Sequence, residues 1–130
     1  MGDRFTVTVA AGSLRSTDGS TVQFPHRWTP EGVTVDADFT GAHLFHLAAA
    51  GCVLNDVYRE AAARGVEVVG VRVVADGGFD EDWTSTGVTY SVELDSTASA
   101  EALTGVLDAV DNVAEIPRAI RAGAQVRRVG

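Results

Sequence analysis

Cysteine is almost absent from this chain: Cys52 is the single cysteine among 130 residues. One thiol excludes an internal disulfide and is too few for a cysteine-rich structural zinc site. No apolar run reaches the roughly 18 residues that a membrane-spanning helix requires. The segment Met1–Phe5 lacks the basic, apolar and small-residue regions of a signal peptide. The sequence therefore predicts a cytoplasmic protein that is not embedded in a membrane.

Positive charge is also scarce. The chain has 10 Lys and Arg residues against 18 Asp and Glu residues, which gives a formal net charge of −8. Binding to nucleic acid depends on clustered Lys and Arg side chains that replace counterions at the phosphates. The basic residues here are scattered, apart from Arg127 and Arg128. This distribution argues against a nucleic-acid partner.

Strands are expected on both sides of a long central helix. Alternating or valine-rich segments predict strands at residues 5–10, 21–24, 33–37, 66–75, 88–94 and, as a last short strand, 125–129. Residues 5–24 are expected to contain a hairpin or the start of a meander. We further expect an acidic turn at residues 76–82, a helix capped by Ser99, and a short helix near Ile116 and Pro117.

The long helix is the most informative segment. It is expected to begin at Gly41 or the next residue and to end at Arg64, with Thr40 as N-cap and Gly65 in the left-handed position beyond its end. Its first half is apolar nearly all the way round, which is typical of a buried helix. A small antiparallel sheet covers one side of such a helix, so a partner subunit is expected to cover the rest in an obligate homodimer. Because strands and helices segregate along the chain, the predicted fold class is α+β in a single domain, residues 1–130.

Three segments together resemble the OsmC/Ohr family of hydroperoxide-reducing proteins. They are residues 44–52 in the long helix, the valine-rich segment 65–73, and the turn at Ile116 and Pro117. The resemblance covers essentially the whole chain and is most specific over residues 40–74. It implies an intertwined homodimer in which antiparallel sheets surround a long buried helix. It also implies a divergent, single-cysteine member, because that family uses two cysteines per subunit.

The resemblance transfers the family's catalytic positions one by one. Cys52 matches the first cysteine, the peroxidatic one. The second cysteine stands just before a proline in that family, and here Ile116 precedes Pro117. The family's Pro-Glu pair at the start of the long helix is replaced by Gly-Ala, so its glutamate is missing. Arg15 lies near the expected position of the family's arginine, which makes it the second catalytic candidate beside Cys52.

Two functions are compatible with these positions. If a Cys52 thiolate attacks a small hydrophobic hydroperoxide, the resulting sulfenic acid needs an external thiol reductant, because no second cysteine captures it. Cys52 lies roughly 15 Å from the start of its helix, where the helix dipole lowers a thiol pKa little, so a nearby arginine is required. The alternative is a dimeric relative without peroxidase chemistry that binds a small apolar ligand in the Cys52 pocket. Cys52 is then a small buried hydrophobe.

Four further residues are candidates for contact with the substrate. His43 is expected at the mouth of the pocket, and Phe45, Trp28 and Phe39 are expected to line it, with core and dimer packing as the alternative role. His43 and His46 form a pair on one helix face that would suit two metal ligands. Histidines near a helix start are more often solvated or bonded to backbone, so neither a metal nor another cofactor is expected.

Overall fold

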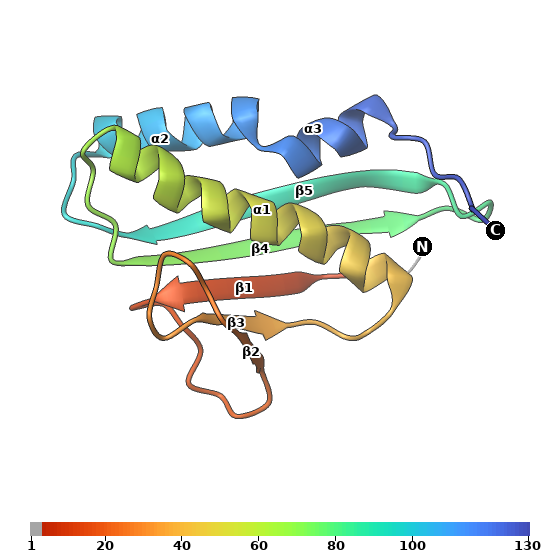
Figure 1. Cartoon of the computed structure of the whole chain (residues 1–130), viewed down its shortest axis with the longest axis horizontal. Helices are drawn as coiled ribbons and strands as arrows, with labels where there is room; N and C mark the ends of the chain where they lie inside the picture. The colour runs from red at the N-terminus through yellow and green to blue at the C-terminus, as the bar shows by residue number, and fades with distance from the viewer. Residues whose placement is uncertain (1–3) are drawn as a thin grey trace.

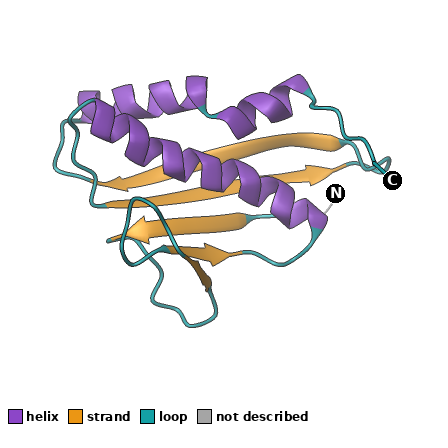
Figure 2. Cartoon of the chain, viewed as in Figure 1, coloured by secondary structure: helices purple, strands orange, loops and turns teal. Residues whose placement is uncertain are grey.

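The computed structural model describes residues 4–130, so residues 1–3 of the segment compared with a signal peptide lie outside the described part. A five-stranded antiparallel sheet carries three helices on one face (Figures 1 and 2). The elements in chain order are β1 Val7–Gly12, β2 Val22–Phe24, β3 Val33–Asp36, α1 Gly41–Ala63, β4 Gly70–Phe79, β5 Ser85–Asp95, α2 Ala100–Val113 and α3 Glu115–Ala122. The strand order in the sheet is β2-β3-β1-β4-β5. This architecture confirms the α+β class.

The ends of α1 are where the sequence predicts them. The side-chain oxygen of Thr40 accepts a hydrogen bond from the His43 backbone N–H at 3.1 Å, which satisfies one of the unpaired donors of the first turn. Beyond the C-cap at Arg64, Gly65 has a φ of +68°, a conformation that glycine adopts without steric cost. The cap of α2 is confirmed as well, since Ser99 accepts from the Ala102 N–H.

One side of α1 packs on the sheet. Val53, Leu54 and Val57 are buried in the core that the helix shares with β1 and β4. On the opposite side, Leu44 and Ala48 are exposed. The helix crosses the sheet diagonally with α2 and α3 along one flank (Figure 1). Within one chain, therefore, α1 is covered on part of its circumference, and its first half is not buried all round.

The first strand lies at the centre of the sheet. Val9 of β1 is opposite Val35 of β3 on one side and Val73 of β4 on the other. The expected hairpin within residues 5–24 is absent from this sheet, because β2 pairs with β3 and not with β1. The buried side chains of β1 explain its place: a strand with a continuous apolar face is stabilised most between two neighbours.

Two other expectations need correction. The segment 76–79 is the end of β4 and not part of a turn, because Asp76 is held on the strand by Arg4 at 2.7 Å and Thr6 at 2.8 Å. The acidic turn begins at Asp80, whose carboxylate accepts from two backbone N–H groups. The last strand, at residues 125–129, does not form, because the chain turns away at Gly123 (φ +67°) and its following residues are exposed.

The two faces of the sheet differ in polarity. The face toward the helices carries the buried valines, whereas the other face carries polar residues such as Thr8, Arg72 and Glu93. Arg72 and Glu93 form an ion pair across β4 and β5 at 2.6 Å. Alternation of this kind is typical of an antiparallel sheet with one packed and one solvated face.

Among residues 4–130, no helix is both long and apolar enough to cross a bilayer.

Candidate functional site

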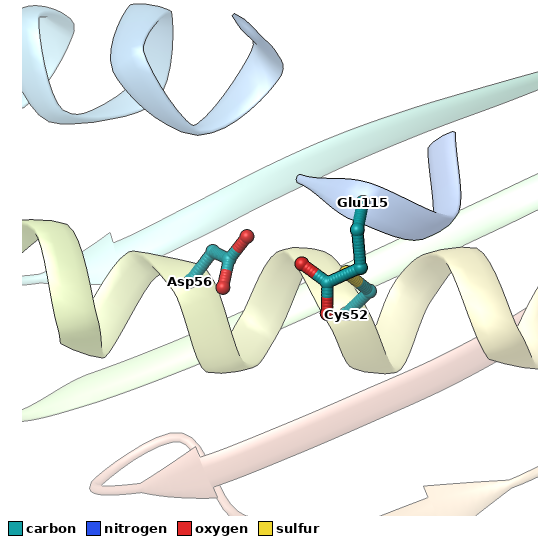
Figure 3. Close-up of side chains that lie close together, drawn as sticks. All are labelled: Cys52, Asp56 and Glu115. Atoms are coloured by element: carbon teal, nitrogen blue, oxygen red, sulfur yellow. The ribbon is translucent and has the colours of Figure 1, made fainter. Parts of the chain in front are cut away.

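Cys52 lies in the middle of α1, on the side that faces α3. The thiol is 8% exposed and has two acidic neighbours: Asp56, one turn further along the helix, and Glu115, the first residue of α3 (Figure 3). Its sulfur and one carboxylate oxygen from each acid all lie within 4.8 Å of one another. We call these three residues the Cys52 cluster. The cluster joins two helices that are far apart in the sequence.

The surroundings of Cys52 favour the protonated thiol. Burial is the main effect that raises its pKa, and the negative charges of Asp56 and Glu115 raise it further. A hydrogen bond from the Ile116 backbone N–H acts in the opposite direction, because it stabilises a thiolate. The net effect is a raised pKa, so the thiol keeps its proton at neutral pH.

Asp56 is the most buried acid of the cluster. The residue is 2% exposed, and its Oδ1 accepts a hydrogen bond from Arg59, whereas its Oδ2 has no hydrogen-bond partner among the residues that the structure describes. Burial raises the pKa of Asp56, and the positive charge of Arg59 lowers it in part. The same guanidinium lies 3.8 Å from Glu115. Arg59 is therefore engaged by the two carboxylates, and the thiol gains little from its charge.

An apolar groove of about 690 Å³ lies beside the cluster, between α1, β5, α3 and the residues that follow α3. Its walls include Phe45, Ala49, Val88, Pro117, Ile120 and Val126. Phe45, Ala49 and Cys52 follow one another at helical spacing on one side of α1. The groove is thus about one helical turn closer to the start of α1 than Cys52, which does not line it.

Arg15 is not close to Cys52 within the chain. Its guanidinium lies 3.9 Å from Glu31, and the residue lines a polar pocket together with Thr8, Thr34 and Arg72. These residues belong to the polar face of the sheet, opposite the helices. The structure therefore separates the two predicted catalytic residues, with the sheet between them.

Of the four predicted contact residues, Phe45 is the one that lines the groove. Phe39 is 91% exposed just before α1. His43 is at the start of α1, where its Nδ1 lies 2.7 Å from the Thr40 hydroxyl and its ring packs edge-on against Phe5. Trp28 packs beside His26 in the loop before β3, away from the groove.

His43 and His46 do not converge on a common point for a metal. His46 is fully buried, and its Nδ1 donates to the Ala42 carbonyl at 2.7 Å. The rings of Phe5, Phe45 and Phe79 surround it. His46 is therefore a core residue of an aromatic cluster, in line with the backbone-bonded role that the sequence favours.

The acids beside Cys52 were not predicted as site residues. Asp56 is four residues after Cys52, so its place on the same helix face is visible in the sequence. Glu115 carries no such signal, because its contact with Cys52 depends on how α3 packs on α1.

The loop before β3 gives a second unpredicted contact, in which His26 Nε2 lies 2.9 Å from Oδ1 of Asn55 on α1.

No protein-family model matches the chain, and no curated protein matches it. Among solved structures, an OsmC-like hydroperoxide resistance protein from Jannaschia sp. CCS1 is similar, with a TM-score of 0.53 and 15% sequence identity. The match covers 97% of this chain and 90% of that protein. A likeness at this sequence identity indicates a shared fold but not a shared chemistry. The chain therefore has an OsmC-like fold.

Proposed function

We propose that this protein is a cytoplasmic homodimer that uses its OsmC-like fold to bind a small, uncharged apolar molecule in the groove beside Cys52. The observation that carries the proposal is the position of Cys52 between Asp56 and Glu115, next to an apolar groove. In this proposal Cys52 is a buried thiol and not a peroxidatic nucleophile.

The reactivity of a thiol supports this choice. The thiolate is the nucleophile, and it is favoured by a nearby cation or a helix N-terminus. Cys52 instead faces two carboxylates and lies in the middle of α1. Its raised pKa leaves little thiolate at neutral pH. A hydroperoxide that reached Cys52 would therefore meet a weak nucleophile.

The groove itself suits an apolar ligand. A volume of about 690 Å³ lies within the range of small-molecule pockets, roughly 300–1,000 Å³. Arg121 is the charged residue in the groove lining, and it is already paired with Asp111 at 3.1 Å. An uncharged ligand leaves that ion pair intact and gains the burial of its apolar surface.

A second subunit is proposed because single chains leave apolar side chains of α1 uncovered. Leu44 and Ala48 are exposed along one side of the helix, and Phe39 is exposed directly before it. A two-fold axis near these residues would bring the same patch of two chains together. Burial of these side chains would stabilise the dimer by about 25 cal/mol for each Å² of apolar area removed from water.

Binding can be tested with N-phenyl-1-naphthylamine, an uncharged probe whose fluorescence rises in apolar surroundings. We expect saturable binding to the wild-type protein. Val126→Asp, which places a charge on the groove wall, should weaken it at least about tenfold, because a charge opposes burial of an apolar ligand. Val129→Asp is the matched control, since both valines are exposed in the segment after α3 but only Val126 lines the groove. Equal affinity in both variants would contradict the proposal.

A thiol-dependent hydroperoxide reductase is the second candidate function. The Ile116 N–H at the sulfur favours it, as does the similar protein's description as an OsmC-like hydroperoxide resistance protein. In that reaction the Cys52 thiolate would attack the outer peroxide oxygen, the O–O bond would break, and an alcohol would leave. The sulfenic acid would then be returned to the thiol by two equivalents of an external thiol, with release of water and a disulfide.

Intact-mass measurement after exposure to an organic hydroperoxide separates the two functions. We expect Cys52 to gain oxygen slowly, at a rate comparable to that of a free thiol such as glutathione. A gain that is orders of magnitude faster than that of glutathione, and that disappears in Cys52→Ser, would replace the binding function with the reductase. A sulfenic-acid trap added during the reaction would identify the product.

A further inference from the structure

We propose that Cys52, Asp56 and Glu115 form a binding site for one divalent metal ion of the zinc type. Their sulfur and carboxylate oxygens already lie within 4.8 Å of one another. A cysteine beside two acids is not a site by that fact alone. The decisive observation is separate: Oδ2 of Asp56 belongs to a residue that is 2% exposed, and within residues 4–130 it has no hydrogen-bond partner.

An unpaired carboxylate oxygen in the protein interior is costly. A buried polar atom without a partner costs about 1–3 kcal/mol, and more when it is charged. Asp56 extends from α1 on the same side as Cys52, and the Glu115 carboxylate lies in front of the sulfur (Figure 3). A cation bound between them would supply the missing partner of Oδ2.

The distances between the three ligand atoms suit a metal ion once these atoms move slightly closer together. Zinc binds thiolate sulfur at about 2.3 Å and carboxylate oxygen at about 2.0–2.2 Å, so tetrahedral ligand atoms lie roughly 3.5 Å apart. Cys52 and Asp56 are fixed on α1 at a spacing of four residues, which places both side chains on one face. Glu115 is exposed at the start of α3, so rotation of its side chain can close the set.

Arg59 gives the site a counter-charge. A thiolate and two carboxylates around a divalent ion have a net charge of −1. Arg59 binds Oδ1 of Asp56 and lies 3.8 Å from Glu115, which leaves Oδ2 of Asp56 available to a metal ion. It would orient Asp56 from behind, as a hydrogen-bond partner commonly does for a metal-binding carboxylate.

The donor set also selects the metal. Thiolate favours borderline and soft ions such as Zn²⁺ and Co²⁺, whereas Mg²⁺ prefers oxygen ligands alone. Because Glu115 is exposed, solvent can provide the fourth ligand and the ion has a path of entry. Binding would deprotonate Cys52 and release one proton to solvent. The site adjoins the proposed ligand groove but does not depend on it.

Cobalt titration of the full-length protein tests the site. We expect one Co²⁺ per chain, with a thiolate-to-cobalt charge-transfer absorption, displacement by Zn²⁺, no displacement by Mg²⁺, and release of one proton per ion. Cys52→Ser should abolish the absorption. Asp56→Asn and Glu115→Gln should each weaken binding at least about tenfold, the scale on which metal sites respond to loss of a supporting group.

Glu101→Gln is the matched control, because Glu101 is the first-turn acid of α2 as Glu115 is that of α3. It should leave cobalt affinity unchanged. Circular dichroism establishes the fold of each variant, and Glu115→Gln tests the site at an exposed residue, without a change in the protein interior. The proposal is overturned if Co²⁺ does not bind at micromolar concentration. It is also overturned if bound Co²⁺ shows no thiolate absorption, or if Glu115→Gln binds as tightly as Glu101→Gln.

Discussion

The hydroxyl of Tyr90 donates a hydrogen bond to Oδ1 of Asp111 across 2.6 Å and so ties β5 to α2. Burial of the ring raises the pKa of Tyr90, and the hydrogen bond and charge of Asp111 raise it further. Arg121 of α3 reaches the same carboxylate at 3.1 Å. One acid thus connects three elements, two of which form walls of the groove.

Removal of this contact should lower stability. We expect Tyr90→Phe to reduce the free energy of unfolding by about 1.5–3 kcal/mol, the range for a hydrogen bond to a charged group. Urea unfolding provides the measurement. Tyr58→Phe is the control, because the Tyr58 hydroxyl is buried without a partner among the described residues and its loss should be neutral or stabilising. A similar loss in both variants would show that the contact itself contributes nothing.

Stability should depend on pH through Asp56. Burial raises its pKa in the folded protein, so the folded state holds this proton more tightly than the unfolded state. The stabilisation from this group is complete below the ordinary carboxyl pKa and is lost as pH rises through the folded value. Asp56→Asn should therefore gain stability relative to wild type as the pH rises above the ordinary carboxyl pKa of about 4. Urea unfolding at several pH values tests this, with the exposed Asp108→Asn as control; a pH-independent difference would contradict it.

Two glycine substitutions should have opposite effects. A Cβ at Gly77 would collide with the His46 ring and the Gly87 carbonyl, so Gly77→Ala should lower the free energy of unfolding by about 1–3 kcal/mol. A Cβ at Gly51 in α1 meets nothing within 4 Å. Gly51→Ala should raise it by about 0.5–1 kcal/mol, because alanine is the better helix former. Parallel thermal melts check both signs.

A cysteine at position 116 should form a disulfide with Cys52. The Ile116 backbone N–H is close enough to Cys52 to affect the pKa of its thiol, so we expect Ile116→Cys to bring a second thiol within reach of Cys52. Mild oxidation should lower the chain mass by two hydrogens and leave no free thiol. Ile120→Cys, one turn further along α3 and lining the groove, should keep both thiols free. Failure of the first variant to oxidise would mean that α3 is placed differently in solution.

The exposed side of α1 should determine the oligomeric state. Light scattering at micromolar concentration should give twice the chain mass. Leu44→Asp should give a folded monomer, because a charge at a self-associating apolar patch opposes burial. Val69→Asp, at an exposed apolar residue before β4, should remain a dimer. A monomeric wild-type protein would refute the dimer proposal.

Features set by neighbouring residues could be predicted from the sequence. The caps at Thr40 and Ser99, the glycine after α1 and the alternation in β5 depend on local chemistry. Pairing partners could not be predicted, because β1 meets β4 across about sixty residues of chain. The position of Arg15 was missed for a similar reason: Gly12, at φ +63°, ends β1 and the chain turns there onto the polar face of the sheet.

The central place of β1 has a consequence for the order of events during synthesis. A ribosome releases β1, β2, β3 and the whole of α1 before residue 70 exists, so one edge of β1 has no partner until β4 arrives. During that interval the apolar face of α1 can pack only on β1, β2 and β3. Unpaired edges and uncovered apolar helices are sites of aggregation. A nascent chain stalled shortly before residue 70 should therefore bind chaperones, and one that has passed residue 95 should not.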